Sequence, residues 1–279
     1  MRNPQDQKKR VLRWVPRAGL IGTLLLILAC TTVPLTERSS LNLVPDAELL
    51  SLSSQQYNEV LQKSKLSADS AKVRMVRTVG ERIAKATEEF MKESGMEADL
   101  KNYKWEFNLI QDDKTVNAWC MPGGKVAVYT GILPLTQDDT GLAVVVGHEI
   151  AHAIAKHGNE RMSEGLLVQL GGTALSVALT KQPAATSQIF MSAYGAAANV
   201  GFLLPYSRLH ENEADRIGLI LMAKAGYDPR QAIPFWQRMN QQGGGDRPPE
   251  FLSTHPAPET RISNIQALIP EAMKYYKGK

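Results

Sequence analysis

The stretch VVVGHEIAHAIAKHG, residues 144–158, decides the fold of this chain. Its apolar run predicts a helix, and four residues of helix turn through about 400°, so His148 and His152 lie one above the other on one face. Both imidazoles can then bind one ion at about 2.0–2.1 Å. Glu149 points to the side, toward a water on that ion. The pattern H-E-x-x-H therefore predicts a zinc site with a general base, and the alternative is an ordinary helix that carries histidines by chance.

Two histidines leave such a site incomplete, because a catalytic zinc takes three protein ligands and keeps one position open. The stretch SRLHENEADRIG, residues 207–218, supplies candidates downstream of His152. Glu211 and Asp215 are four residues apart on one face of a predicted helix, whereas Glu213 points elsewhere. We expect Glu211 to be the third ligand, and Asp215 to hydrogen-bond a histidine ligand or to assist proton transfer. The alternative is a solvated acidic patch at the start of a helix.

Four stretches of the sequence together resemble one family of enzymes. They occur in the order VNAWCMPGGKVAVYTGIL (116–133), VVVGHEIAHAIAKH (144–157), SRLHENEADRIG (207–218) and STHPAPETRI (253–262). They are similar to the zinc metallopeptidases grouped with the CAAX prenyl protease, the HtpX heat-shock membrane protease and the periplasmic quality-control protease BepA. The resemblance implies a gluzincin-type fold, α+β and predominantly helical, with a small antiparallel sheet beside the H-E-x-x-H helix.

The resemblance also implies roles for single residues. Glu149 is expected to be the catalytic base, Asp215 a proton-transfer or orienting residue, and the ligands of one zinc ion per chain are expected to be His148, His152 and Glu211. His255 is placed near the metal, where it either stabilises the oxyanion of the tetrahedral intermediate or occupies the open zinc position and keeps the enzyme latent. The alternative is a histidine that caps the last helix.

The resemblance further implies how substrate is held. The strand KVAVYTG, residues 125–131, is expected to be an edge strand beside the zinc that pairs with extended polypeptide. Backbone pairing demands few particular side chains, which suits unfolded or misassembled proteins. Asn117 and Ala118 either line that cleft or are purely structural. The chain lacks the several long apolar spans of the membrane-embedded relatives, so processing of prenyl peptides inside a bilayer is not expected.

Outside the motifs, apolar spacing predicts mostly helices and about three antiparallel strands. One helix should begin near residues 67–70, and residues 165–204 predict a helical hairpin packed on the body, with membrane or hydrophobic-substrate contact as the alternative. Cys120 is expected to be buried in a strand as a small hydrophobe, whereas His157 and His210 are expected to be surface histidines.

The beginning of the chain predicts export and a lipid anchor. Residues 1–29 have the basic head and short apolar core of a lipoprotein signal peptide, after which Cys30 would be lipidated. A plain signal peptide or an uncleaved anchor is the alternative. Residues 30–55 are expected to be a polar tether, and residues 56–279 the zinc metallopeptidase domain. Thr31 favours the outer over the inner bacterial membrane, because it stands where many retained lipoproteins have aspartate.

Charge and motifs together set the expected function. Outside residues 1–29 the chain has 26 Lys and Arg against 27 Asp and Glu, so no nucleic-acid partner is expected. We expect a periplasm-facing, membrane-tethered zinc endopeptidase that hydrolyses misfolded or misassembled cell-envelope proteins. One alternative is a chaperone-like envelope assembly factor with a latent protease site. Another is a structural lipoprotein that binds no metal.

Overall fold

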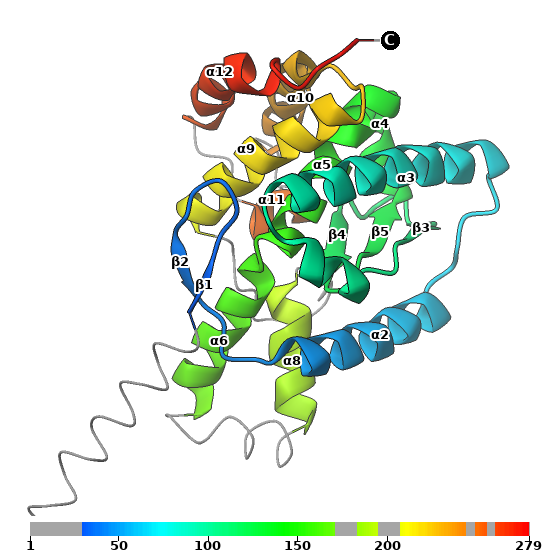
Figure 1. Cartoon of the computed structure of the whole chain (residues 1–279). Helices are drawn as coiled ribbons and strands as arrows, with labels where there is room; N and C mark the ends of the chain where they lie inside the picture. The colour runs from blue at the N-terminus through cyan, green and yellow to red at the C-terminus, as the bar shows by residue number, and fades with distance from the viewer. Residues whose placement is uncertain (1–29, 171–182, 195–206, 244–248, 256–259, 279) are drawn as a thin grey trace, which may run out of the picture.

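The computed structural model describes residues 30–170, 183–194, 207–243, 249–255 and 260–278 of the 279-residue chain. The predicted signal peptide, residues 1–29, lies outside the described residues, and so do parts of the expected helical hairpin between residues 165 and 204. The fold is predominantly helical around a small sheet, as the sequence predicts (Figure 1). No helix in the described ranges is both long and apolar enough to cross a membrane.

A three-stranded sheet lies at the centre of the fold. Its strands are β3 (Glu106–Ile110), β4 (Ala118–Met121) and β5 (Lys125–Tyr129), in the spatial order β3-β5-β4. The β4–β5 pair is antiparallel and turns at Pro122-Gly123-Gly124, with positive φ at both glycines. The β3–β5 pair is parallel, so the sheet is mixed and not antiparallel throughout. The chain runs from β3 to the opposite edge as β4 and then turns back as β5 between them, so β3 and β5 run in the same direction.

Both faces of the sheet are buried because helices cover each of them. Alternate side chains of β4 and β5, such as Cys120 and Val126, face the core formed with α3 (Ser70–Glu93) and α5 (Asp139–Ile154). The side chains between them, such as Trp119, face a second core. That core is built with α2 (Asp46–Lys63), α6 (His157–Leu170) and α8 (Pro183–Ala193). Cys120 is buried in its strand, as predicted.

Helix α5 crosses α9 (Arg208–Lys224) at two glycines, and this crossing sets the position of the site. A Cβ added to Gly147 would lie 3.0 Å from the carbonyl oxygen of Gly218, and one added to Gly218 would lie 3.0 Å from the backbone nitrogen of His148. Only glycine at both positions lets the backbones approach so closely. The crossing therefore brings His148, next in sequence to Gly147, against the face of α9 that carries Glu211 and Asp215.

Short elements connect and cover these helices. The connections are η1 (Glu97–Asn102), η2 (Thr130–Ile132), α4 (Leu133–Thr136) and η3 (Pro229–Gln231). Beyond α9, the chain forms α10 (Ala232–Gly243), α11 (Glu250–Thr254) and α12 (Arg261–Ala272). Helix α12 packs along α9, and the backbone nitrogen of Phe251 in α11 donates to Val116 O, just before β4. The C-terminal elements thus lie over the α5–α9 crossing.

The segment expected to be a tether is instead folded onto the domain. Residues 30–41 form a hairpin from β1 (Cys30–Thr32) and β2 (Ser39–Leu41), which lies beside α6 and α9 in Figure 1. Helix α2 then begins at Asp46, well before residue 56. The segment was predicted to be a tether because most of its residues are polar. A few apolar residues nevertheless pack in the core, such as Val33 and Val44, which are 1% and 2% exposed.

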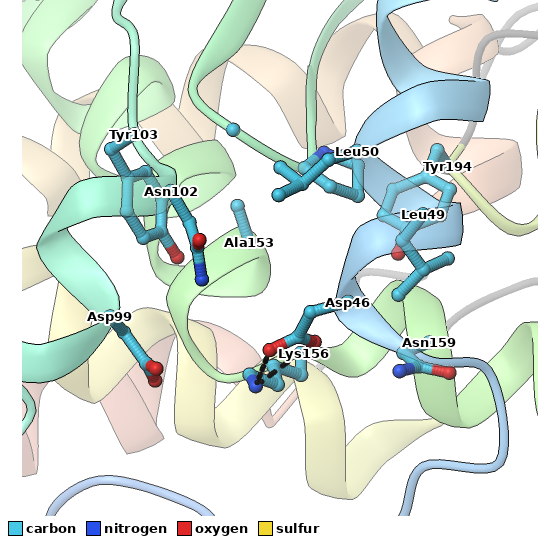
Figure 2. A pocket seen from close by; sticks show the side chains of 12 residues that line it. Asp46, Leu49, Leu50, Asp99, Asn102, Tyr103, Ala153, Lys156, Asn159 and Tyr194 are labelled. Carbon is cyan, nitrogen blue, oxygen red and sulfur yellow. Dashed lines mark hydrogen bonds and ion pairs between the residues drawn. The ribbon is translucent and has the colours of Figure 1, made fainter.

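Helix α2 is fixed at a small pocket beside the turn between α5 and α6, shown in Figure 2. Lys156 Nζ lies 2.9 Å from Asp46 Oδ2 at one side of this pocket. The volume is about 40 Å³, and Leu49, Tyr103 and Tyr194 contribute to the walls. None of the residues predicted to bind metal lines it, so the pocket belongs to the docking of α2.

Candidate active site

Helix α5 carries the first part of the site and is held from its first turn. Its N-cap is Asp138, whose carboxylate accepts a hydrogen bond from the backbone nitrogen of Gly141 at 2.8 Å. Nearly every later residue of the helix is buried, including His148, Glu149 and His152 at 2–3% exposure. Three ionisable side chains in an apolar helix are costly to bury unless they bind something or one another.

Four donor atoms from three elements converge at this point. His148 Nε2 lies 3.1 Å from His152 Nε2 and 3.3 Å from His255 Nδ1. Glu211 Oε1, from the first turn of α9, lies 3.3 Å from His152 Nε2 and 3.0 Å from His255 Nδ1. His255 follows α11 directly and is 1% exposed. The structure therefore brings His255 into the same cluster as the three predicted ligands.

The spacing of these atoms matches the size of a zinc ion. Four ligands at about 2.05 Å from a tetrahedral ion lie about 3.3 Å from one another. Four of the six separations are between 3.0 and 3.3 Å, and all six are within 4.8 Å. The donor set of imidazole nitrogens with one carboxylate oxygen is one that zinc prefers. The described residues thus fit a single zinc ion.

Glu149 lies beside the four donors without being one of them. Its Oε1 is 3.4 Å from His255 Nε2, and no group in the described part of the chain donates a hydrogen bond to it. A buried carboxylate oxygen without a donor is rare and indicates a missing partner such as a water. Burial raises the pKa of Glu149 to about 8. A nearby divalent cation would lower that pKa again, because it favours the negative form.

Asp215 and a buried arginine support two of the donors. Asp215 Oδ1 lies 3.0 Å from His148 Nδ1, the ring nitrogen that faces away from the cluster. Arg261 in α12 is 2% exposed and donates to Asp215 Oδ1 at 2.7 Å and to Glu211 Oε2 at 2.6 Å. Its guanidinium also lies 3.5 Å from the ring centre of Trp236. Arg261 offsets the negative charge of both carboxylates, and the sequence assigned it no role although it stands in the motif STHPAPETRI.

His157 and His210 were expected on the surface, and this prediction is wrong. They are 0% and 4% exposed, and their rings stack 4.6 Å apart. A helix that ran on from His152 would turn His157 away from the cluster, but α5 ends at Ile154 and Lys156 has φ of +57°. The reversal starts α6 at His157 and turns its ring back toward His152, with the two Nδ1 atoms 2.9 Å apart.

The protein groups shift the pKa values of the donors in opposite directions. Burial opposes the charge of His148, but Glu211 and Asp215 outweigh it and raise the pKa of His148 to about 9. Burial lowers the pKa of His255 to about 4 and that of His152 well below its usual value. Burial also opposes the charge of Glu211, yet Arg261 and the histidines hold its pKa well below the usual range. Three of the four donors are therefore in the form that binds a metal at neutral pH.

The strand expected to hold substrate is not the one at the edge. KVAVY is β5, which has β3 on one side and β4 on the other, so both of its backbone edges are occupied. The strand that contacts α5 and has no described strand on its second side is β4. Periodicity shows that a strand exists but not its place in the sheet, which accounts for the error.

Together, the H-E-x-x-H helix, the glutamate on a second helix and the adjoining small sheet define a gluzincin metallopeptidase. The model of Peptidase family M48 matches residues 78–269, and the chain belongs to this family.

Several proteins are similar to the chain. It is 40% identical to the mitochondrial metalloendopeptidase OMA1 of Schizosaccharomyces pombe over 176 residues. These aligned residues make up 62% of this chain and 49% of the relative. It is 30% identical to the human mitochondrial metalloendopeptidase OMA1, over 98% of this chain and 52% of that protein. A putative beta-barrel assembly-enhancing protease of Vibrio cholerae is 33% identical over 54% of this chain and 32% of the relative. The chain thus spans about half the length of the OMA1 proteins it matches.

These relatives correct the expected location. A bacterial envelope position, facing the periplasm from the outer membrane, was predicted from residues 1–31. The two OMA1 relatives are mitochondrial proteins of eukaryotes, and the bacterial protease matches a smaller share of the chain. A basic head before a short apolar run is not specific enough to assign a compartment, so the prediction of a bacterial outer-membrane location is wrong.

Proposed function

We propose that this chain is a zinc-dependent endopeptidase in which His148, His152 and Glu211 bind the metal and Glu149 is the catalytic base. The observation that carries the proposal is the set of donor atoms at zinc spacing with the unpartnered Oε1 of Glu149 beside it. An ordinary core helix would not leave three histidines and two carboxylates facing one another away from water.

The residues divide the work of peptide hydrolysis. Zinc, when bound, would polarise the scissile carbonyl and lower the pKa of a water toward 7. Glu149 Oε1 takes a proton from the water that attacks the scissile carbonyl, and Glu149 later delivers this proton to the leaving amine. Asp215 holds the ring of His148 through Nδ1, so that Nε2 stays directed at the cluster. Arg261 keeps Asp215 and Glu211 ionised.

The substrates we propose are misfolded or misassembled polypeptides. Such chains offer extended backbone, which pairs with a free strand edge whatever its side chains are. Strand β4 offers that edge and packs on α5. Asn117, which precedes β4, donates to Glu250 at the start of α11, so the near end of the edge lies beside the segment that carries His255. The start of this edge and His255 therefore lie on neighbouring segments.

In the arrangement described, His255 is proposed to take the fourth metal position. The position that substrate and water need would then be closed, and peptide hydrolysis would require His255 to move away. This favours a latent enzyme over an oxyanion role for His255. The position of His255 within the donor cluster is also compatible with a second function. In that function the chain is a chaperone-like assembly factor whose cleft holds clients while the protease site stays closed.

Glu149→Gln separates these functions. The variant keeps the size of the side chain but cannot take a proton, so casein hydrolysis should fall about 100- to 10,000-fold while zinc content stays at one ion per chain. Glu271→Gln, a half-exposed glutamate paired with Arg216, is the matched control and should hydrolyse casein like the unaltered protein. Casein hydrolysis by Glu149→Gln at the unaltered rate would refute the mechanism. Full prevention of client aggregation by Glu149→Gln would favour the chaperone-like function.

Attachment to a membrane through a lipid on Cys30 stays a prediction. Cys30 is the first residue of β1, and the residues before it lie outside the described part of the chain. Mass spectrometry of the mature protein checks it: a chain that begins at Cys30 and carries acyl groups is the expected result, and an unmodified Cys30 would contradict it.

A further inference from the structure

The two histidine ligands are supported by different kinds of partner. His148 uses a carboxylate directly, since its Nδ1 faces Asp215. His152 instead faces the ring of His157, with 2.9 Å between the two Nδ1 atoms. His157 Nε2 in turn lies 3.1 Å from Glu213 Oε2. We call the series His152–His157–Glu213 the histidine relay.

Hydrogen-bond chemistry allows one arrangement of protons in the histidine relay. A metal held by His152 Nε2 requires the proton of that ring to be on Nδ1. His157 must then accept this proton's hydrogen bond at Nδ1, so its own proton is on Nε2. From Nε2 it donates to Glu213, which must be an ionised carboxylate to be a strong acceptor. The orientation of His152 thus depends on where Glu213 is held and on its charge.

Glu213 is held by the N-terminal hairpin, residues 30–41. Arg38 donates to it from Nε at 3.1 Å and from Nη2 at 2.9 Å, and Thr36 donates from Oγ1 at 2.6 Å. The same guanidinium forms two bonds of 2.8 Å with Glu160 in α6, whose Oε2 lies 3.0 Å from His210 Nε2. Arg38 is the cation that lets two largely buried carboxylates stand side by side.

This hairpin lies outside the residues that match the family model, 78–269. We propose that Arg38 is a positioning residue of the active site, which acts through Glu213 and His157 to fix the proton and ring orientation of the metal ligand His152. The inference rests on the proposed function, because it takes His152 as a ligand. It adds that the peptidase site is complete only when the N-terminal hairpin is docked.

The test is the zinc affinity of the full-length protein, measured by competition with a chromogenic chelator. Arg38→Gln should weaken zinc binding about 10- to 100-fold, as loss of an outer hydrogen-bond partner of a ligand does elsewhere. Arg38→Lys keeps the positive charge but loses the paired N–H donors of the guanidinium. Its zinc affinity should lie between that of the unaltered protein and that of Arg38→Gln. Arg216→Gln is the matched control. Arg216 also contacts the hairpin, through Leu35 O, and pairs with Glu271, yet it touches no member of the relay.

A double-mutant cycle distinguishes positioning from general support of the fold. In a His157→Ala background, Arg38→Gln should have no further effect on zinc affinity if Arg38 acts through His157. The absorption spectrum of the cobalt-substituted protein should change in Arg38→Gln and not in Arg216→Gln. Equal losses of Tm in the two arginine variants with unchanged zinc affinity would refute the positioning role. An unaltered protein that binds no zinc would instead refute the proposed function.

Discussion

At the scale of single residues, the four clustered donor side chains and Asp215 beside His148 could be predicted, whereas the other supporting residues could not. His148, Glu149 and His152 follow from helical spacing, and Glu211 from the second acidic face. His157 was missed because a single residue in the left-handed region, Lys156, ends the helix, and no composition rule marks a lysine for that conformation.

Arg38 and Arg261 were missed for a related reason. Both are arginines that offset buried carboxylates, but sequence shows neither their burial nor their partners. Arg261 is 2% exposed in α12. It belongs to the motif STHPAPETRI, in which the sequence indicated a role only for His255. Arg38 belongs to a polar segment taken for a tether. Long-range charge pairing of this kind is visible only once the helices are placed.

His255→Ala is expected to raise the basal rate of casein hydrolysis several-fold, because removing the fourth donor opens a position for substrate. Three donors remain, so the zinc content should stay at one ion per chain, with weaker affinity. Kinetics at saturating zinc, with chelator competition in parallel, provide the measurement. Thr254→Ala is the control, since it removes a buried side chain from the same segment but no donor. Unchanged rate and unchanged affinity in His255→Ala would make His255 a structural residue.

At the scale of elements, helices were predicted better than the sheet. Helix α3 begins at Ser70, within the predicted start, and α5 and α9 contain the stretches predicted to be helical. The parallel pairing of β3 was missed because the period of a strand carries no information about its neighbours. The prediction of a helical hairpin is supported only in part, by the described portions of α6 and α8, which pack together.

Gly218→Ala is expected to weaken zinc binding although residue 218 binds nothing. The new Cβ would lie 3.0 Å from backbone atoms of α5, so the helices must separate by a few tenths of an ångström, at a cost of about 1–3 kcal/mol. That shift moves Glu211 away from the histidines. Urea unfolding and chelator competition measure the two effects.

Gly95→Ala provides the comparison for this variant. Gly95 has φ of +73° and open space around its Cβ position, so the substitution strains the backbone by about 1–2 kcal/mol far from the helix crossing. It should lower stability without changing zinc affinity. If Gly218→Ala behaved in the same way, the close approach of the helices would not be what sets the metal site.

At the scale of the whole molecule, the four sequence motifs were sufficient to identify the family, because they come together at one site. The donors lie on α5, on α9 and after α11, and they join residues that are 107 positions apart in the chain. A bound ion would therefore link three parts of the fold. The predicted location was wrong, since it rested on residues 1–31, a short segment that does not assign a compartment.

Removal of zinc is expected to lower Tm, and the metal-free protein should be most stable near pH 6.5. Folding raises the pKa of His148 to about 9, so acidification from pH 9 to 6.5 adds stability. Burial lowers the pKa values of His157 and His255 to about 4. Below pH 6.5 these two residues therefore bind protons in the unfolded chain but not in the folded one, so further acidification lowers the stability. Glu149, with its pKa raised to about 8, offsets only part of that loss.

Urea unfolding in chelator across pH 9 to 4, repeated with zinc, measures this dependence. Zinc at 100 times its dissociation constant should add about 2.7 kcal/mol at neutral pH. It should also remove the gain between pH 9 and 6.5, because a zinc-bound imidazole is neutral. A stability that kept rising down to pH 4 would contradict the burial of neutral histidines.

The reversal at Lys156 fixes the length of the sequence around the histidines. Helix α6 starts directly after it, so one inserted residue would rotate all of α6 by about 100° and shift it along its axis. His157 and Glu160 would then both leave their partners at once. The pattern H-E-x-x-H-x-x-x-x-H is thus a single unit that tolerates neither insertion nor deletion, and a search for chains built in this way should require the fifth-residue histidine at that fixed interval.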